Sequence, residues 1–171
     1  DGEFTGAVAF RGYVIFFKEH CIHKIYGQNP PYTVNTSYIR GVQKGSHKSL
    51  CIVNETLYYK SPNGICSFEG GLPVDISAPL GGAYYTDAVG GVLGNRYYIS
   101  MSDKNKTRVL FTFDEMRNIW HKEDNLDVKE FASHNGNLYF IGTVKGEKRL
   151  CLADGENVYG NFSGELAGWF L

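Results

Sequence analysis

The hydrophobic positions of this chain fall in short runs that recur at a regular spacing. A turn containing Gly or Asn precedes an aromatic-rich run four times, in Arg11–Phe16, Asn54–Tyr59, Gly94–Ile99 and Gly136–Ile141. Equivalent positions lie about 40–44 residues apart, which is the spacing typical of four-stranded propeller blades. The pattern therefore predicts a structural repeat.

Each repeat contains three further segments that we expect to be strands. A short apolar segment precedes each turn, at Ala7–Phe10, Ser49–Val53, Ala88–Leu93 and Glu130–Ser133. A third strand follows the aromatic run, at Cys21–Gly27, Ile65–Gly70, Arg108–Asp114 and Arg149–Gly155. A fourth segment completes each unit, at Tyr32–Ile39, Pro73–Ile76, Asn118–Lys122 and Asn157–Asn161. Each unit is thus expected to be an antiparallel meander.

Such a meander is marginally stable alone, because one or both of its apolar faces remain in water. Stacking the sheets face to face around an axis buries those faces. The sequence therefore predicts an all-β fold, a β-propeller repeat domain over 1–171. Its expected blades cover roughly 5–42, 47–84, 86–126 and 128–165. The alternative is a β-sandwich whose periodicity is coincidental.

Helical signals are weak. The best candidate is Asp114–His121, which suits an outer strand equally well.

Four units can close as a small propeller or form an arc of a larger one. The chain begins at Asp1, inside the first unit, and ends in the apolar segment Leu166–Leu171. From these ends we expect a part of a longer protein. An arc would expose apolar faces on its terminal blades, so self-association of two copies is a further hypothesis.

Composition supports a packed core and narrows the classes of partner. Hydrophobic residues make up 43% of the chain and charged residues 20%, with a formal net charge of −1. Because no basic block is present, a nucleic-acid partner is not expected. Because no run of about 18 apolar residues occurs, a membrane span is not expected either.

The four cysteines give no metal-binding signature. None forms a CxxC pair and each lies in an apolar segment, so we expect buried free thiols in a reducing compartment. The most metal-like cluster is His20-Cys21-Ile22-His23, in which Cys21 and His23 would share one face of a strand. Two ligands do not make a zinc site, so neither metal nor cofactor is predicted.

No local motif predicts catalysis. Asp103–Thr107 resembles calcium loops and Asp-box turns but lacks their Gly, so a hairpin tip is expected. No G-x-S-x-G elbow and no phosphate-binding glycine motif occurs. Glu69 and Asp154 both precede Gly at the end of a third strand, which favours a turn role. The scattered carboxylates are Glu19, Glu69, Asp75, Asp87, Asp114, Glu115, Asp154 and Glu156. We therefore predict no enzyme activity and assign no catalytic residue, although carboxylates distant in sequence can meet near a propeller axis.

Two sets of surface residues suggest other roles. Exposed aromatic residues on the blade rims could stack on sugars or on a protein, or pack between blades; the candidates are Trp120, Tyr84, Tyr85 and Trp169. Four asparagines fit the N-x-[ST] glycosylation pattern, namely Asn35, Asn54, Asn105 and Asn161. Since these residue types crowd into turns, coincidence explains the asparagines.

Two parts of the chain carry distinctive sequence phrases, namely Tyr13–His20 followed by Ile25-Tyr26-Gly27, and the run from Ser49 through Phe68-Glu69-Gly70-Gly71 to Ile76-Ser77. These phrases resemble those of bacteriophage and prophage tail-associated propellers. This resemblance implies a non-catalytic structural role in a virion, in a tail or head–tail component held by contacts with other protein subunits. It also implies a location in the virion or, for a prophage product, the bacterial cytoplasm.

Two other functions remain open. One is a carbohydrate-binding or sugar-acting propeller. The other is a cellular adaptor of the kelch or WD type. Gly-Gly doublets at 70–71, 81–82 and 90–91 suggest kelch repeats, but the kelch period is longer, about 50 residues. No Trp-Asp dipeptide typical of WD repeats occurs.

Overall fold

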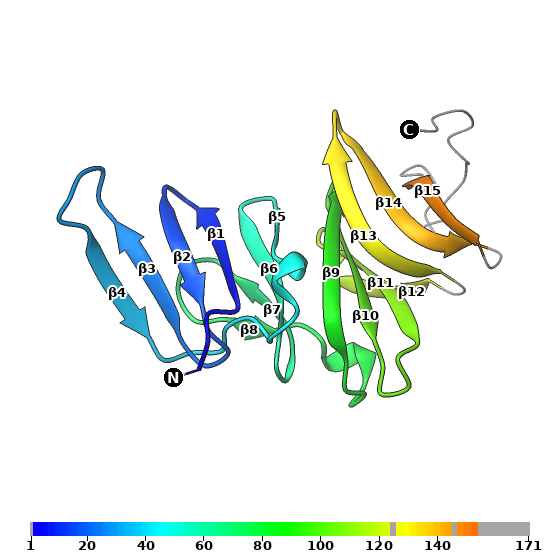
Figure 1. Ribbon diagram of the computed structural model, residues 1–171, viewed down its shortest axis with the longest axis horizontal. Coiled ribbons are helices and arrows are strands. Elements are labelled where there is room, and N and C mark those ends of the chain that lie inside the picture. The colour runs from blue at the N-terminus through cyan, green and yellow to red at the C-terminus, as the bar shows by residue number, and fades with distance from the viewer. Residues whose placement is uncertain (1, 124–125, 145–146, 154–171) are drawn as a thin grey trace.

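The computed structural model describes residues 2–123, 126–144 and 147–153, which form β-sheets joined by loops (Figure 1). Two short 3-10 helices, η1 (His47–Ser49) and η2 (Ala78–Leu80), interrupt the loops. In this part of the chain no α-helix occurs, and no helical segment has the length and hydrophobicity needed to cross a membrane. The prediction of an all-β fold is therefore confirmed.

The strands form four antiparallel sheets, each a meander of strands that are consecutive in the chain. The first sheet contains β1 (Gly6–Phe10), β2 (Tyr13–Phe17), β3 (Ile22–Tyr26) and β4 (Thr33–Ser37). The second contains β5 (Cys51–Val53), β6 (Thr56–Ser61), β7 (Gly64–Phe68) and β8 (Val74–Asp75). The third contains β9 (Thr86–Leu93), β10 (Arg96–Ser102), β11 (Arg108–Asp114) and β12 (Ile119–Glu123). The fourth contains β13 (Asp127–His134), β14 (Asn137–Val144) and β15 (Glu147–Ala153). The expected segment Asn157–Asn161 lies outside the described residues.

The first hairpin of each sheet turns over two residues, as the repeat predicts. Both turn residues have positive φ in Arg11-Gly12, Asn54-Glu55 and Asn135-Gly136, which is the signature of type I′ turns. In the fourth unit the turn residues are Asn135-Gly136, one residue earlier than the predicted Gly136-Asn137. Asn-Gly is the pair that best tolerates two consecutive positive φ angles, which explains the difference. The helical candidate Asp114–His121 instead spans the turn between β11 and the outer strand β12.

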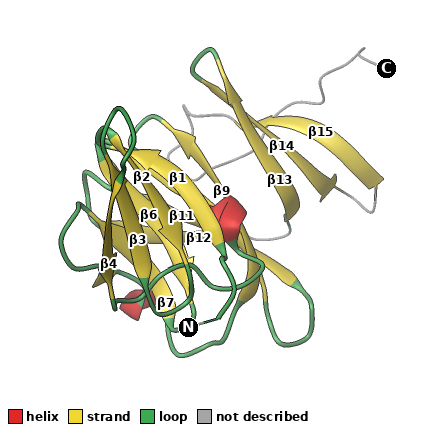
Figure 2. Cartoon of the chain, turned by 60° about the vertical axis from the view of Figure 1, so that its left-hand side comes forward, coloured by secondary structure: helices red, strands yellow, loops and turns green. Residues whose placement is uncertain are grey.

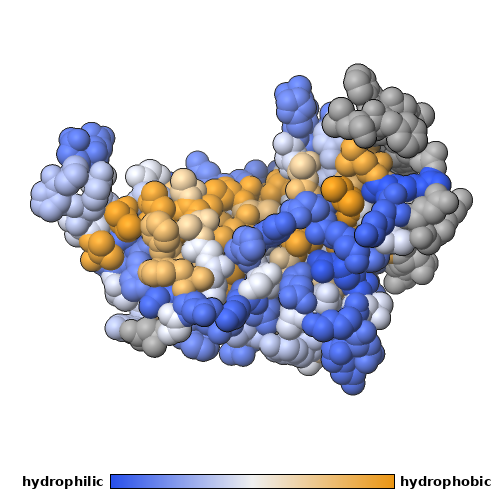
Figure 3. All heavy atoms as spheres, viewed as in Figure 1, coloured by the Kyte–Doolittle hydropathy of each residue, from blue (hydrophilic) through white to orange (hydrophobic). Residues whose placement is uncertain are grey.

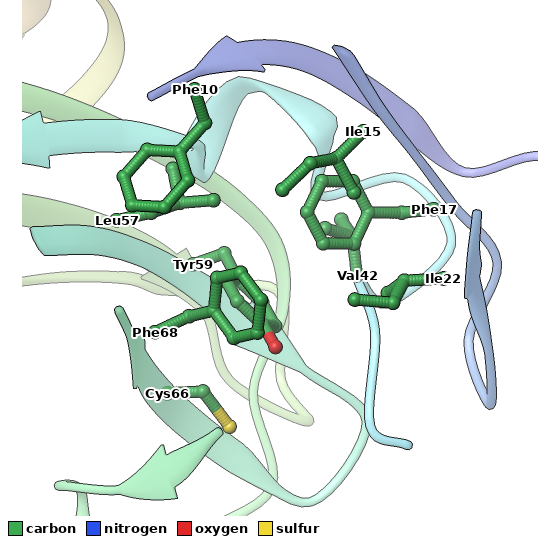
Figure 4. Close-up of a cluster of buried hydrophobic side chains, with 9 residues drawn as sticks. All are labelled: Phe10, Ile15, Phe17, Ile22, Val42, Leu57, Tyr59, Cys66 and Phe68. Atoms are coloured by element: carbon green, nitrogen blue, oxygen red, sulfur yellow. The ribbon is translucent and has the colours of Figure 1, made fainter. Parts of the chain in front are cut away.

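Consecutive sheets pack face to face, and each contact buries a hydrophobic cluster. Figure 4 shows the first cluster, in which side chains of the first and second sheets point toward one another. It contains Phe10, Ile15, Phe17, Ile22, Val42, Leu57, Tyr59, Cys66 and Phe68. The second cluster joins the second and third sheets, and the third cluster joins the third and fourth. The fold therefore depends on contacts between sheets.

Strand β6 shows how one strand serves two clusters. Alternate side chains point to opposite faces of a strand. Leu57 and Tyr59 pack against the first sheet, while Tyr58 stacks on Tyr97 of the third sheet with ring centroids 5.3 Å apart. Every residue of β6 is buried. This two-sided burial explains why these strands appear as continuous apolar runs in the sequence.

The first strands of neighbouring sheets lie close together, and a glycine doublet permits this. Strand β9 contacts both β5 and β13. A Cβ atom at Gly90 would lie 2.9 Å from the Cys51 sulfur of β5, and one at Gly91 would lie 2.8 Å from the Phe131 ring of β13. The doublet at 90–91 thus has a packing role in a strand. The doublets at 70–71 and 81–82 lie outside the strands.

The four sheets form an open row. The first sheet lies at the left and the fourth at the right in Figure 1, and Figure 2 shows the first sheet in front of β6 and β11. Each hydrophobic cluster found among the described residues joins sheets that are consecutive in the chain. The described residues therefore do not close into the four-unit ring that was one expectation from the sequence.

The close approach at β9 yields a stability prediction. Gly91→Ala should lower the free energy of unfolding by about 1–3 kcal/mol, because the added methyl overpacks the contacts with Phe131 of β13 and Leu138 of β14. Gly71→Ala is the matched control, since a Cβ atom there meets nothing within 4 Å. Its effect should stay within about 0.5 kcal/mol. Urea denaturation measures both variants, and equal stabilities would contradict the packing role.

Candidate functional site

The first sheet has one buried face and one exposed apolar face. In β2, Ile15 and Phe17 point to the second sheet, so Val14 and Phe16 point away from it. Across the ladder to β3, Val14 pairs with Ile25 and Phe16 pairs with His23. Val14 is 39% exposed. The outer face thus carries apolar side chains that the described residues leave open to solvent.

The residue pairs of this outer face have buried equivalents in the other sheets. The equivalent cross-strand pairs are Leu57–Phe68 and Tyr59–Cys66, Tyr97–Phe113 and Ile99–Phe111, and Leu138–Ala153 and Phe140–Cys151. All of these residues belong to the cluster that their sheet shares with the preceding sheet. By repeat position, the outer face of the first sheet is therefore equivalent to the faces that pack against a preceding sheet. No other sheet of the described residues covers it.

We call this surface the leading face and define it by Val14, Phe16, His23, Ile25 and Val34. Val34, in β4, pairs with Ile25 and is 56% exposed, which extends the surface to the outer strand. Hydrophobic residues reach the molecular surface over this end of the molecule, at the left of Figure 3. A contiguous exposed apolar surface of this kind typically marks an interaction site.

Aromatic side chains and a depression border the leading face. The Phe4 ring packs edge-on against Phe16 and His23, with centroid distances of 5.9 and 5.7 Å. Tyr32 and Ala9 join Val14, Phe16 and Ile25 around a shallow depression. The depression is thus lined mainly by apolar side chains.

The fourth sheet carries a second apolar face, at the other end of the row. Its residues Tyr139, Ile141, Leu150 and Leu152 form cross-strand pairs between β14 and β15, on the side opposite Leu138. We call them the trailing face. Ile141 is 47% and Leu150 is 49% exposed. In the inner sheets, residues at the repeat position of Tyr139 are buried against the following sheet, as Tyr58 and Tyr98 are.

A cavity of about 200 Å³ lies between the second and third sheets and contains a buried lysine. It is lined by Lys60, Ile65, Ser77, Tyr84 and Tyr85, among others. Lys60 is only 3% exposed, and its ammonium donates a 2.6 Å hydrogen bond to the carbonyl oxygen of Ser61. Burial lowers the pKa of Lys60 from 10.5 to about 8.

Sequence reasoning missed Lys60. The sequence did contain a signal that could have singled it out, because Lys60 is a charged residue at the repeat position where the other units carry Phe17, Ser100 and Ile141.

The sequence analysis also did not predict a buried polar network that lies beside this cavity. Gln43 donates from its side-chain nitrogen to the Tyr84 hydroxyl and to the Tyr85 carbonyl, both at 3.2 Å. The Tyr97 hydroxyl donates to the carbonyl oxygen of Ser49 at 2.8 Å. Ser46 accepts the backbone N–H of Ala88 at 3.1 Å. The loop before the second sheet therefore ties that sheet to the third.

The structure brings Cys21 and His23 together, as strand alternation predicted. The Cys21 sulfur lies 3.7 Å from the Nε2 atom of His23, and the Nδ1 atom of His23 lies 2.8 Å from the Thr36 hydroxyl. In residues 2–123, 126–144 and 147–153, no group of three or more His, Cys, Asp or Glu side chains is placed to hold a metal ion.

The acidic candidates lie in separate local interactions. Asp103 accepts the backbone N–H groups of Asn105 and Thr107 at 2.8 and 2.9 Å, so this segment is a hairpin tip. Ion pairs join Asp75 to Arg40, Asp87 to Lys106, and Asp114 to Arg96 and Arg117. Glu19 accepts the backbone N–H of Lys44, and Glu69 contributes its carbonyl oxygen to Arg11. The candidates Asp154 and Glu156 lie outside the described residues.

The aromatic candidates divide between packing and exposure. Trp120 donates from its ring nitrogen to the carbonyl of Ile76 at 2.8 Å and packs on Phe113, so it joins the second and third sheets. Tyr85 packs against Phe111, while Tyr84 is exposed at the cavity. Trp169 lies outside the described residues.

The cysteines and the N-x-[ST] asparagines are the remaining candidates from the sequence. The four cysteines are free thiols. Burial raises the pKa of Cys51 to about 12 and also raises those of Cys66 and Cys151, so these thiols stay protonated near neutral pH. Three of the asparagines, Asn35, Asn54 and Asn105, are exposed. The fourth, Asn161, lies outside the described residues.

Comparison of the chain with protein-family models and with curated proteins found no match. The resemblance to phage tail propellers therefore stays a prediction from the sequence phrases.

The buried lysine yields a pH-dependent prediction. Below pH 8, Lys60 is charged in both the folded and unfolded states, so the folded state carries the full cost of burying the charge. Between pH 8 and 10.5, the folded protein releases this proton first and its stability rises. Lys60→Met should therefore be more stable than wild type by about 1–3 kcal/mol at pH 7, and this advantage should shrink by pH 10.

Urea denaturation of both proteins at the two pH values tests this expectation. The control is Lys104→Met, at an exposed position of the β10–β11 hairpin, where the difference from wild type should stay constant with pH. If the difference in free energy of unfolding between Lys60→Met and wild type is also independent of pH, the interpretation that burial destabilises the Lys60 ammonium is wrong.

Proposed function

We propose that this chain is an arc of β-propeller blades that acts as a non-catalytic protein-interaction module in a bacteriophage or prophage particle. The observation that carries the proposal is the leading face, an apolar surface at the end of a row of stacked sheets. Its repeat positions are those used for sheet-to-sheet contacts elsewhere in the chain. Other protein subunits of a tail or head–tail assembly are the proposed partners.

The arrangement of the first strands supports the propeller interpretation. In a propeller, the first strands of successive blades line a common axis, so they approach one another closely. Strand β9 contacts both β5 and β13, and Lys48 of η1 pairs with Glu130 of β13. The glycine doublet of β9 permits the same approach. These contacts are those expected of an arc of blades.

The distribution of charged groups supports a non-catalytic role. Glycoside hydrolysis requires two carboxylates about 5–10 Å apart at one site. The described carboxylates of Asp75, Asp87 and Asp114 instead form ion pairs with separate basic side chains. The separate pairing of these three carboxylates agrees with the structural role implied by the sequence phrases.

The proposed function predicts that the chain is a component of purified particles. Mass spectrometry of particles from the organism that encodes it should detect the chain at a fixed ratio to the capsid protein. Genes for capsid, portal or tail proteins should flank its gene. Recovery only outside the particles, together with a gene placed in a metabolic operon, would refute the virion assignment.

A carbohydrate-binding role is the second candidate, and one observation favours it. Tyr84 is exposed beside the cavity that also contains Lys60 and Asn63, so an aromatic ring and polar groups lie together. A glycan array with wild type and Tyr84→Ala tests this role, with Tyr38→Ala as a control at an exposed tyrosine that does not line this cavity. Glycan binding that Tyr84→Ala alone abolishes would favour this candidate.

A further inference from the structure

Lys60 carries a charge at a repeat position where the fold does not require one. The other units place the neutral residues Phe17, Ser100 and Ile141 there. Strand alternation puts the Lys60 side chain on the same side of β6 as Tyr58, which stacks on the third sheet. Burying a charge costs free energy, and residues that break a local rule in this way are expected at functional sites. The position therefore indicates a role for the ammonium group other than packing.

The described residues satisfy the hydrogen-bonding capacity of this ammonium group only in part. An ammonium group has three N–H donors. The one hydrogen bond that Lys60 donates within the described part of the chain goes to the carbonyl oxygen of Ser61 at 2.6 Å. Asp75 acts on Lys60 electrostatically, but its carboxylate pairs with Arg40 and accepts from the Ser77 hydroxyl. Since buried charges are normally paired, an anion is the group that this site lacks.

The cavity that Lys60 lines has room for a small ligand. It is bounded by the turn between β6 and β7 and by the loop that contains η2, and its volume is about 200 Å³. A cavity of roughly 150 Å³ accommodates a molecule of the size of benzene. Tyr84 lines the cavity and is 64% exposed, so the cavity reaches the molecular surface. A small molecule can therefore enter it from solvent.

The wall of the cavity combines the cation with a second hydrogen-bond donor. The Tyr84 hydroxyl accepts a hydrogen bond from the Gln43 side chain at 3.2 Å, and no described residue accepts its own proton. Lys60 is mainly charged at pH 7, since its lowered pKa is about 8. A cationic donor and a neutral donor in one cavity match the two oxygens of a carboxylate, with which charged donors form strong hydrogen bonds.

We propose that this cavity binds a small ligand that carries a carboxylate group, and that the Lys60 ammonium is the group that recognises the carboxylate. The bound anion offsets the cost of burying the ammonium group. The site lies between the second and third sheets and does not use the leading face, so it is independent of the proposed interaction module. It shares its cavity with the carbohydrate candidate, but it depends on a charge that neutral sugars lack.

Isothermal titration calorimetry with glucose, glucuronate and acetate tests the requirement for the charge. Glucuronate has the ring of glucose with a carboxylate added, and acetate is the carboxylate with almost nothing else. Wild type should bind glucuronate at least about tenfold more tightly than glucose, because a hydrogen bond to a charged group contributes that much. Acetate should bind more weakly at the same site and compete with glucuronate.

Two matched variants assign the effect to this lysine. Lys60→Met should abolish the preference for glucuronate over glucose and the binding of acetate. Lys104→Met removes the same charge at an exposed position of the β10–β11 hairpin and should leave both unchanged. Urea denaturation verifies that the variants fold, and glucuronate should raise the denaturation midpoint of wild type but not that of Lys60→Met.

Three results would overturn the carboxylate site. They are the absence of binding of both acids to wild type, equal affinities for glucose and glucuronate, and binding of glucuronate that Lys60→Met leaves unchanged. Equal affinities for the two sugars would at the same time favour the carbohydrate candidate. The particle assignment would stand after any of these results, because mass spectrometry of particles tests it separately.

Discussion

Burial on both faces of each sheet is the constraint on which this structure depends. A meander of short strands buries little apolar surface by itself and is marginally stable in water. Here alternate residues of one strand enter two different hydrophobic clusters, as Leu57 and Tyr58 do in β6. Each inner sheet is therefore stabilised by its two neighbours, and nearest-neighbour contacts account for most of the stability of the row.

The same constraint explains the surface of the molecule. Among the described residues, an end sheet packs against one other sheet only, yet its sequence follows the two-sided pattern of the repeat. Val14 at one end, and Ile141 and Leu150 at the other, are apolar residues of these faces that are 39%, 47% and 49% exposed. The proposed function as an interaction module arises from this incomplete burial.

Polar groups also contribute to the contact between the second and third sheets. The loop that precedes the second sheet is buried, and its serines and Gln43 satisfy backbone groups of the neighbouring strands. Lys60 is buried in the same region at an electrostatic cost, since burial disfavours its charged form. The contact between the second and third sheets therefore combines a hydrophobic cluster with a polar network. It borders the cavity that Lys60 lines.

The amino-acid sequence by itself determined the all-β class, the four units and, to within one residue, the positions of their first hairpins. These depend on local properties, namely alternation, aromatic runs and turn residues such as Asn135-Gly136. The tertiary structure alone decided that the described sheets form an open row, that Gly90 and Gly91 allow β9 to approach its neighbours, and that Lys60 is buried. These features depend on contacts between residues of different sheets, and no local pattern encodes which faces meet.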